Sequence, residues 1–425
     1  MSARVLIFLI ALLDFVIQLV KTYLSDLQIK KPLPAEVADI YEPERYQEYL
    51  NYRMDNRKCG LFFTGISLPL MTLLIFSEIF NAIEKFAGHN PYYIFIITLL
   101  IFYGIEIFIS IVEDYYDTFF IEEKYGLNKQ SKKDFAKDTI LDIAQSLLLL
   151  ICFGLFITFV GERIPTWTKD FTISFWKALL LGVTIIFSLL CVVFAGALLS
   201  LLVLRLQYKF TPLPDGQLKD KIMALQESSK KKVKHLYVYD ESKKTTSKNA
   251  SLLRIFWYRA FFIADNFVNE NSEDELLAVI SHEIGHLKHK KNLLNYINYL
   301  QIVLLAAVIV SVISRPEIIF QVNKWIRASF NITVNNYLVW VAVISSMFTP
   351  IFDISEIFNN YRSRQEEHEA DREAVKNGYG DALIATFKRM GSDELINVNP
   401  HPVIEFLDYD HPGMYQRIRA IKQAQ

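Results

Sequence analysis

The sequence predicts a mainly α-helical protein that crosses a membrane several times. Hydrophobic residues make up 52% of the 425 residues and the mean hydropathy is +0.22, more apolar than is usual for a soluble domain. Apolar stretches that approach or exceed the roughly 20 residues needed to span a bilayer indicate about seven transmembrane helices. They lie at 4–20, 61–82, 92–112, 141–160, 176–204, 293–314 and 337–355.

Charge and cysteine content exclude two classes of site. The chain carries 45 lysines and arginines against 46 aspartates and glutamates, a formal net charge of −1. No overall basic field is therefore available to hold a nucleic-acid backbone. The three cysteines, Cys59, Cys152 and Cys191, form no CxxC pair, which argues against a disulfide framework and against a cysteine-based metal site. The expected surroundings are a lipid bilayer and not nucleic acid.

Acidic residues within the apolar stretches are a further feature. Asp14 interrupts the first stretch, which has no A-x-A-like cleavage site, so we expect an anchor that stays in the protein and not a removed signal peptide. Glu78, Glu106 and Asp142 lie in later stretches. Each is expected to face the bundle interior or a water-filled space. The alternative, a position at the end of a span, fits Glu78 and Asp142 better than Glu106.

Basic residues alternate between the predicted connections and indicate the orientation of the chain. Lys and Arg concentrate on the cytoplasmic side, and the second connection offers only Lys85. The amino terminus is therefore expected outside, with residues 206–291 and those after 356 together in the cytoplasm. The crowded first and third connections carry Lys21, Lys30, Lys31, Arg45, Arg53, Arg57 and Lys58, and Lys124, Lys129, Lys132, Lys133 and Lys137.

This topology predicts a division of the chain into four parts. Residues 1–205 form a membrane bundle of five spans with its loops, and 292–355 supply spans six and seven. Residues 206–291 and 356–425 lie on one side of the membrane and build one domain between them.

A metal-binding motif lies in the first of these two parts. Ser272 and Glu275 fit a capping box at the start of a helix, and that helix carries His282 and His286. At i and i+4 the two imidazoles project from one face and can bind the same tetrahedral Zn²⁺. Glu283, one residue after the first histidine, can act as general base on the attacking water. The motif is HExxH.

A catalytic zinc keeps three protein ligands and one open position, so a third ligand is required. No Asp or Glu occurs between His286 and Pro316, which excludes a glutamate a short helix downstream. Asn292 stands where a third histidine of the extended motif would be. His289 lies nearly two turns from His282 and is therefore the weaker alternative.

The next acidic cluster spans residues 363–371 on the side expected for the motif. Glu367 and Asp371 are four residues apart and share a helical face. Glu367 can bind the metal while Asp371 orients a ligand histidine through its second nitrogen. A solvated helix face is the other interpretation, and it suits Glu366 and Glu369 better.

A small β-hairpin is expected close to the motif. Residues 235–240 and 253–263 are rich in aromatic and β-branched residues and flank a polar turn region. An edge strand beside the metal would bind an extended peptide by main-chain hydrogen bonds. Ordinary sheet packing is an equally good interpretation.

The ordered set of motifs resembles the integral-membrane zinc CAAX prenyl proteases of type I. The resemblance rests on HEIGH at 282–286 followed by S-R-x-x-E-x-x-A-D at 363–371. Residues 118–128, residues 210–216 and the run Asp410-His411-Pro412 with Arg417 are similar to the same family.

The resemblance implies a ring of seven helices around a large water-filled chamber, closed on the cytoplasmic side by the zinc domain. It also implies one Zn²⁺ per chain, held by His282, His286 and Glu367. His411 would donate to the oxyanion and Asn249 would hold the substrate backbone. Behind the ligands the resemblance places Asp371, Arg364 and Arg417.

The implied activity is hydrolysis of peptide bonds in membrane-associated substrates. In a source that prenylates proteins, the resemblance implies removal of the three residues after a C-terminal prenylcysteine, in the endoplasmic reticulum membrane. In a bacterium, quality control of unprenylated membrane proteins in the inner membrane is the alternative. A transporter with a structural metal is disfavoured by Glu283 and the open fourth position. The chain is expected to act as a monomer.

Two departures from the family pattern bear on selectivity. Asn249-Ala250-Ser251 stands where the family has N-A-Y, and His411-Pro412-Gly413 where it has H-P-P. The first removes an aromatic contact to the peptide. Neither touches an expected ligand or the base.

Overall fold

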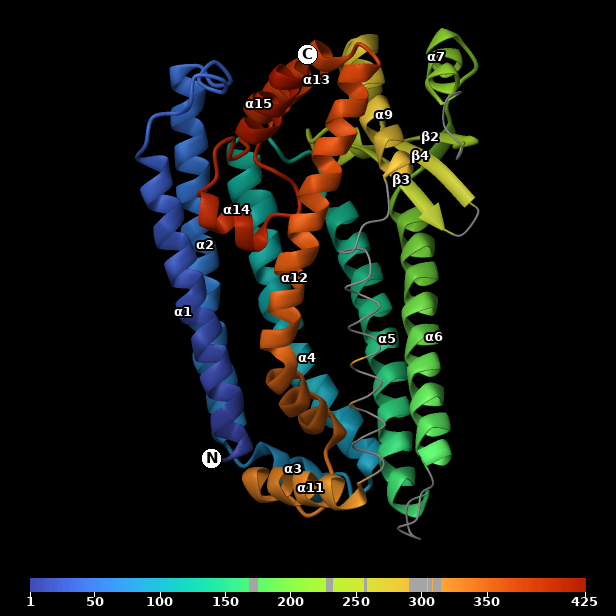
Figure 1. Ribbon diagram of the computed structural model, residues 1–425. Coiled ribbons are helices and arrows are strands. Elements are labelled where there is room, and N and C mark those ends of the chain that lie inside the picture. The colour runs from blue at the N-terminus through green and yellow to red at the C-terminus, as the bar shows by residue number, and fades with distance from the viewer. Residues whose placement is uncertain (168–174, 227–231, 256–257, 290–303, 305–307, 309–314) are drawn as a thin grey trace.

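Six long apolar helices stand side by side in the computed structural model (Figure 1), which describes residues 1–167, 175–226, 232–255, 258–289, 304, 308 and 315–425. Each is long and apolar enough to cross a membrane. The mainly helical, multi-span fold is confirmed, while the stretch predicted at 293–314 lies largely outside the described residues. The helices are α1 (Ala3–Ile29), α2 (Pro43–Phe76), α4 (Pro91–Tyr116), α5 (Lys132–Trp167), α6 (Phe175–Gln207) and α12 (Tyr337–Lys376).

Two of these helices continue well beyond their apolar stretches. α2 begins at Pro43, although its apolar stretch begins only at residue 61, and α12 runs on to Lys376 without a break at residue 355. At its start, α12 is capped by the Asn336 side chain, which accepts hydrogen bonds from the backbone of Leu338 and Val339. The polar half of α12 extends beyond the apolar part of the bundle. The acidic cluster at 363–371 therefore lies outside the membrane-spanning part of the molecule.

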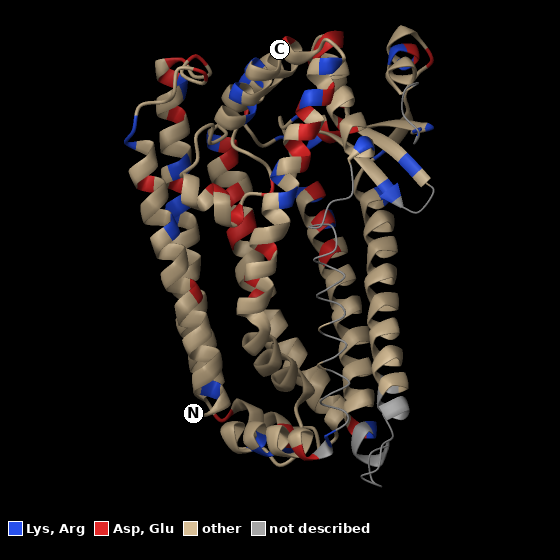
Figure 2. Cartoon of the chain, in the orientation of Figure 1, with Lys and Arg blue, Asp and Glu red and all other residues tan. Residues whose placement is uncertain are grey.

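The two ends of the bundle differ in composition. At one end, α3 (Ile79–Phe86) and α11 (Pro316–Phe330) pack together, with the Phe80 and Phe330 rings 4.8 Å apart edge to face. At the other end, charged residues gather on the helices that form the extramembrane domain (Figure 2). These are α7 (Gln217–Leu225), α8 (Asp265–Glu270), α9 (Glu273–Lys288), α13 (Gly380–Asp393), α14 (Pro402–Asp408) and α15 (Met414–Ala424).

A four-stranded sheet of order β1-β2-β4-β3 flanks α9. Its strands are β1 (Phe210–Pro212), β2 (His235–Tyr239), β3 (Ala250–Ile255) and β4 (Tyr258–Ala264). The expected hairpin between 235–240 and 253–263 is wrong in its pairing, because β2 runs parallel to β4. The run at 253–263 contains parts of two strands, and β3 and β4 form the antiparallel hairpin. β3 is consequently one of the two edge strands of this sheet, and β1 is the other.

The connection between α1 and α2 belongs to the core of the extramembrane domain. Val37, Ile40 and Tyr41 are buried in one cluster with Phe387 and Ile418. The Tyr41 hydroxyl lies within hydrogen-bond distance of two carbonyl oxygens, that of Gly391 near the end of α13 at 2.6 Å and that of Ile396 just after it at 2.7 Å. This domain therefore draws on segments from both ends of the sequence, and its polar inner face holds the residues described next.

Candidate metal centre and active site

The close packing of α9 on α12 brings the two predicted halves of the site together. The Ser272–Glu275 capping box fixes the start of α9: the Ser272 amide donates to the Glu275 carboxylate at 2.8 Å, and the Glu275 amide donates back to the Ser272 hydroxyl. One turn from the motif's first histidine, Gly285 lies against buried Ala370. A Cβ atom at position 285 would come within 2.6 Å of the Ala370 Cα. The absence of a side chain there sets the separation of the two helices.

We expect Gly285→Ala to push α9 away from α12 and to weaken both folding and metal binding. Overpacking of this kind typically costs about 1–3 kcal/mol. Thermal unfolding and metal content of the purified variant would measure the effect. Gly65→Ala is the matched control, since Gly65 on α2 has no neighbour within 4 Å of the added methyl group. Equal melting temperatures for the two variants would contradict the packing argument.

His282, His286 and Glu367 place one ligand atom each within 4.8 Å of one another. The two Nε2 atoms are 3.2 Å apart, and they lie 3.4 Å and 3.2 Å from the Glu367 carboxylate oxygens. Ligand atoms around a tetrahedral Zn²⁺ with bonds of about 2.0–2.2 Å are roughly 3.3–3.6 Å apart. Glu367 Oε2 is moreover buried without a hydrogen-bond partner, so a shared cation would satisfy an otherwise orphaned acceptor.

The outer nitrogens of both imidazoles are tied to other side chains. His282 Nδ1 lies 2.9 Å from Asp371 Oδ1, and His286 Nδ1 lies 2.8 Å from His289 Nε2. If each Nδ1 carries the proton and donates it outward, each Nε2 keeps a lone pair that faces the other ligands. The arrangement therefore favours the tautomers that metal binding requires.

Arg417 from α15 supports this arrangement from behind. It is largely buried, and its guanidinium donates to both oxygens of Asp371, at 2.9 and 2.6 Å. It also lies 3.3 Å from Glu367 and stacks over the Phe387 ring at 4.2 Å. Asp371 is thus held between a histidine and an arginine, which fixes its orientation.

Replacing Asp371 with alanine should weaken metal binding about 10- to 100-fold without abolishing the site, as the loss of a residue that orients a ligand usually does. Competition with a chromophoric chelator would measure the affinity. Unchanged affinity in a folded variant would show that Asp371 has no part in holding His282.

One cavity of about 220 Å³ joins His282, His286 and Glu367 to four other predicted site residues, which are Glu283, Asn249, His411 and Arg417. Glu283 lies on its wall beside His282, and burial raises the pKa of the Glu283 carboxyl above its ordinary value. Asn249 enters from the start of β3 and Arg417 from α15. A peptide along β3 would therefore pass the metal-binding residues, with a carboxylate positioned to accept a proton.

His411 lies at the open side of this cavity. Its side chain is 57% exposed, with Nδ1 2.8 Å from Asp410 and Nε2 3.4 Å from the Glu367 carboxylate. Nε2 therefore lies next to the proposed metal-binding atoms, on the wall of the cavity. The position suits a hydrogen-bond donor to an oxyanion.

Arg364 has contacts different from those expected of a residue behind the ligands. It is buried on α12, but its guanidinium donates to the backbone carbonyls of Glu405 and Phe406, at 2.9 and 3.2 Å, and of Tyr409. Arg364 lies one turn before Glu367 on α12. Its long side chain extends to α14. It positions the segment that leads to His411, and among the described residues its side chain has no hydrogen bond or ion pair with His282, His286 or Glu367.

Two residues at this site, His289 and Glu394, were given little or no weight in the sequence analysis. His289 holds His286, and its own Nδ1 lies 3.0 Å from Glu369, so two side chains follow one another behind His286. The i to i+3 spacing from His286 was the available signal. Glu394 holds the approach to Asn249: its carboxylate accepts from the Ser247 hydroxyl and the Lys248 amide, both at 2.9 Å.

Comparisons with known proteins match nearly the whole chain. A family model described as the CAAX prenyl protease N-terminal domain with five membrane helices matches residues 24–199. A model of peptidase family M48 matches residues 212–425.

Similar proteins include the probable CAAX prenyl protease 1 of Schizosaccharomyces pombe, 28% identical over 92% of this chain and 82% of the relative. The CAAX prenyl protease 1 homolog of Arabidopsis thaliana is 25% identical over 96% and 95%. Among solved structures, the crystal structure of S. mikatae Ste24p superposes with a TM-score of 0.75, 22% identity and 99% coverage of both chains.

Proposed function

The chain belongs to peptidase family M48 and is a membrane metalloendopeptidase, and on this premise we propose that it uses one Zn²⁺ per chain to cleave C-terminally prenylated proteins. His282, His286 and Glu367 would hold the ion. The observation that carries the assignment is the mutual spacing of their ligand atoms, together with a buried Glu367 Oε2 that has no hydrogen-bond partner.

A bound Zn²⁺ supplies a Lewis acid that polarises the scissile carbonyl and lowers the pKa of the attacking water. The protein's own groups supply the proton transfers and the positioning. Glu283 would accept the proton of the attacking water and pass it to the leaving amine. The Glu283 pKa, raised by burial, brings this carboxylate closer to the working range of a base at neutral pH.

Substrate alignment would come from the edge of the sheet. β3 pairs with β4 on one side only among the described strands, so its outer side is available to the backbone of an extended peptide. Asn249 at the start of β3 would hold that backbone at the cavity. His411 would donate to the oxygen that becomes negative as the peptide bond is attacked.

The orientation of the chain is a further part of the proposal. The basic first and third connections lie at the same end of the bundle as the extramembrane domain (Figure 2). Since Lys and Arg concentrate on the cytoplasmic side, this domain would face the cytoplasm, where the C termini of prenylated proteins are found. The chain would act as a monomer because every side chain of the proposed site comes from one copy.

Mapping of cleavage sites by mass spectrometry would test the substrate assignment. Purified protein in detergent would receive a farnesylated peptide ending in a CAAX tripeptide and the same peptide without the farnesyl group. We expect chelator-sensitive cleavage after the farnesylcysteine and slow or no cleavage of the unprenylated peptide. Equal, scattered cleavage of both would favour a quality-control peptidase, and absence of chelator-sensitive cleavage would overturn the peptidase assignment.

A further inference from the structure

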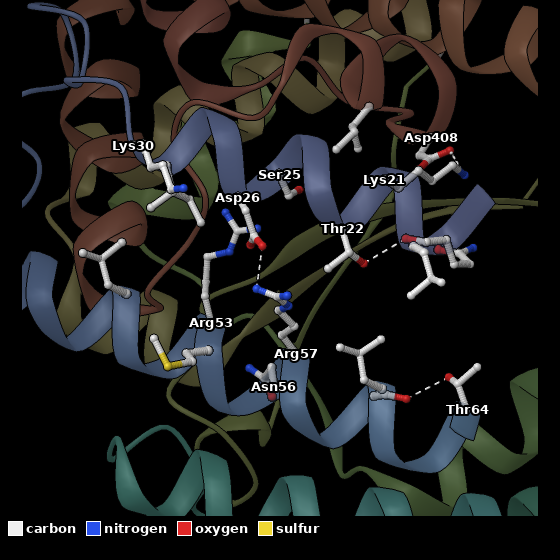
Figure 3. A pocket seen from close by; sticks show the side chains of 18 of the residues that line it. Lys21, Thr22, Ser25, Asp26, Lys30, Arg53, Asn56, Arg57, Thr64 and Asp408 are labelled. Atoms are coloured by element: carbon white, nitrogen blue, oxygen red, sulfur yellow. Dashed lines mark hydrogen bonds and ion pairs between the residues drawn. The ribbon is translucent and has the colours of Figure 1, made fainter. Parts of the chain in front are cut away.

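A second cavity, of about 900 Å³, lies between α1 and α2 and is bordered by Ile404 and Asp408 of α14 (Figure 3). None of its lining residues lines the proposed catalytic cavity. It is therefore a separate space that peptide hydrolysis does not account for.

The lining of this cavity changes from apolar to charged along its length. α1 and α2 run in opposite directions (Figure 1), so the apolar part of one helix faces the apolar part of the other. Phe15, Leu19 and Leu61 line one end, within the apolar stretches at 4–20 and 61–82. Lys30 and Arg53 line the other end, beyond those stretches. Such a gradient matches a molecule that lies across the boundary between hydrocarbon and water.

The charged end carries an excess of cations. Arg57 pairs with Asp26 at 2.5 Å (Figure 3), and Lys21 pairs with Asp408 at 2.7 Å. The lining contains two further cations and no further acid. These two cations, Lys30 and Arg53, therefore give the cavity a net positive charge.

Arg53 is oriented without being neutralised. It donates to the Tyr49 hydroxyl at 3.0 Å, and its guanidinium lies 5.8 Å from the centre of the Tyr49 ring. Neither Arg53 nor Lys30 forms an ion pair within the part of the chain that the structure describes. A cation fixed in place and lacking a carboxylate suits an external anion.

We propose that this cavity binds an anionic phospholipid from the leaflet next to the extramembrane domain. The phosphate would lie between Lys30 and Arg53, with an acyl chain alongside Phe15, Leu19 and Leu61. Basic pockets between transmembrane helices are suited to anionic headgroups, and here the apolar end supplies the surface for the chain of the same molecule. The lipid would link α1 to α2 beside α14.

Native mass spectrometry of the full-length protein in detergent tests the proposal. The probes are dioleoyl phosphatidylglycerol and dioleoyl phosphatidylcholine, which share acyl chains and differ in net charge. We expect tighter binding of phosphatidylglycerol. Lys30→Gln together with Arg53→Gln should weaken it roughly 30-fold, from about fivefold for each cation. Lys30→Gln alone should show the fivefold loss if the double variant does not fold.

Lys31→Gln is the matched control, because Lys31 is an exposed neighbour of Lys30 that does not line the cavity. It should bind phosphatidylglycerol as the unmodified protein does. An equal loss in Lys31→Gln would indicate diffuse attraction to basic surface and overturn the assigned cavity. Equal affinity for both lipids would overturn the choice of an anionic ligand. Displacement of phosphatidylglycerol by millimolar inorganic phosphate would show that the acyl chain contributes nothing to the affinity. This result would overturn the proposal that the ligand is a lipid.

Discussion

Glu283→Gln should remove almost all peptide hydrolysis while leaving the metal and the substrate bound. In the proposed mechanism Glu283 takes the proton of the attacking water, and an amide cannot do so. Loss of a general base typically costs about 10²–10⁴-fold in rate. We expect the upper end, because Glu283 lines the cavity beside His282 and a neutral amide in its place offers no comparable proton acceptor. Single-turnover cleavage of the farnesylated peptide would measure the rate.

Glu273→Gln is a control of the same chemistry on the same helix. Glu273 is in the first turn of α9, away from the cavity, and pairs with Lys221 at the surface. This variant should cleave normally, since surface ion pairs contribute little. Metal content and binding of a labelled peptide should match the unmodified protein in both variants. Near-normal turnover by metal-loaded Glu283→Gln would end the general-base assignment.

Glu367→Gln is expected to lose metal and activity together. Its carboxylate lies against the imidazoles of His282, His286 and His411 and against the Arg417 guanidinium. Its Oε2 has no hydrogen-bond partner. A neutral amide would remove the anionic ligand and leave Arg417 with less compensating charge. The affinity loss should exceed the roughly 100-fold upper value for residues that only orient a ligand. Metal analysis after dialysis against a weak chelator would measure it.

Glu366→Gln is the neighbouring control on α12. Glu366 is directed to Arg362 at 3.7 Å and lies outside the catalytic cavity. Its replacement should leave metal content unchanged. Full metal retention in Glu367→Gln would require a different third ligand, with His411 as the next imidazole within reach of the site.

The membrane spans and the position of HExxH could be predicted because both depend on local patterns. Apolar length fixes a span, and i to i+4 spacing fixes two imidazoles on one helical face. The pair Glu367 and Asp371 also followed from spacing, once Lys and Arg in the loops had placed residues 206–291 and those after 356 on one side. Each of these signals lies within a single helix or in the alternation of basic loops along the chain.

The features that could not be predicted depend on which distant segments meet in the folded protein. The pairing of β2 with β4 was missed because strand composition does not say which neighbour a strand takes. The resemblance placed Arg364 behind the ligands, yet its guanidinium donates to backbone carbonyls of α14. His289 was given little weight as a ligand because of its distance from His282 along the helix. Its contact with Glu369 depends on how α9 crosses α12.

The proposed metal ligands are synthesised at two different times. His282 and His286 leave the ribosome on α9, and Glu367 follows only after the apolar stretch at 293–314, α11 and the first half of α12. A nascent chain therefore has two imidazoles and a base but lacks the third ligand that a catalytic zinc requires. With His282, His286 and Glu367 as the proposed ligands, hydrolysis would begin only once α12 has packed on α9. Partly made copies of the chain would therefore be without the activity of the finished protein.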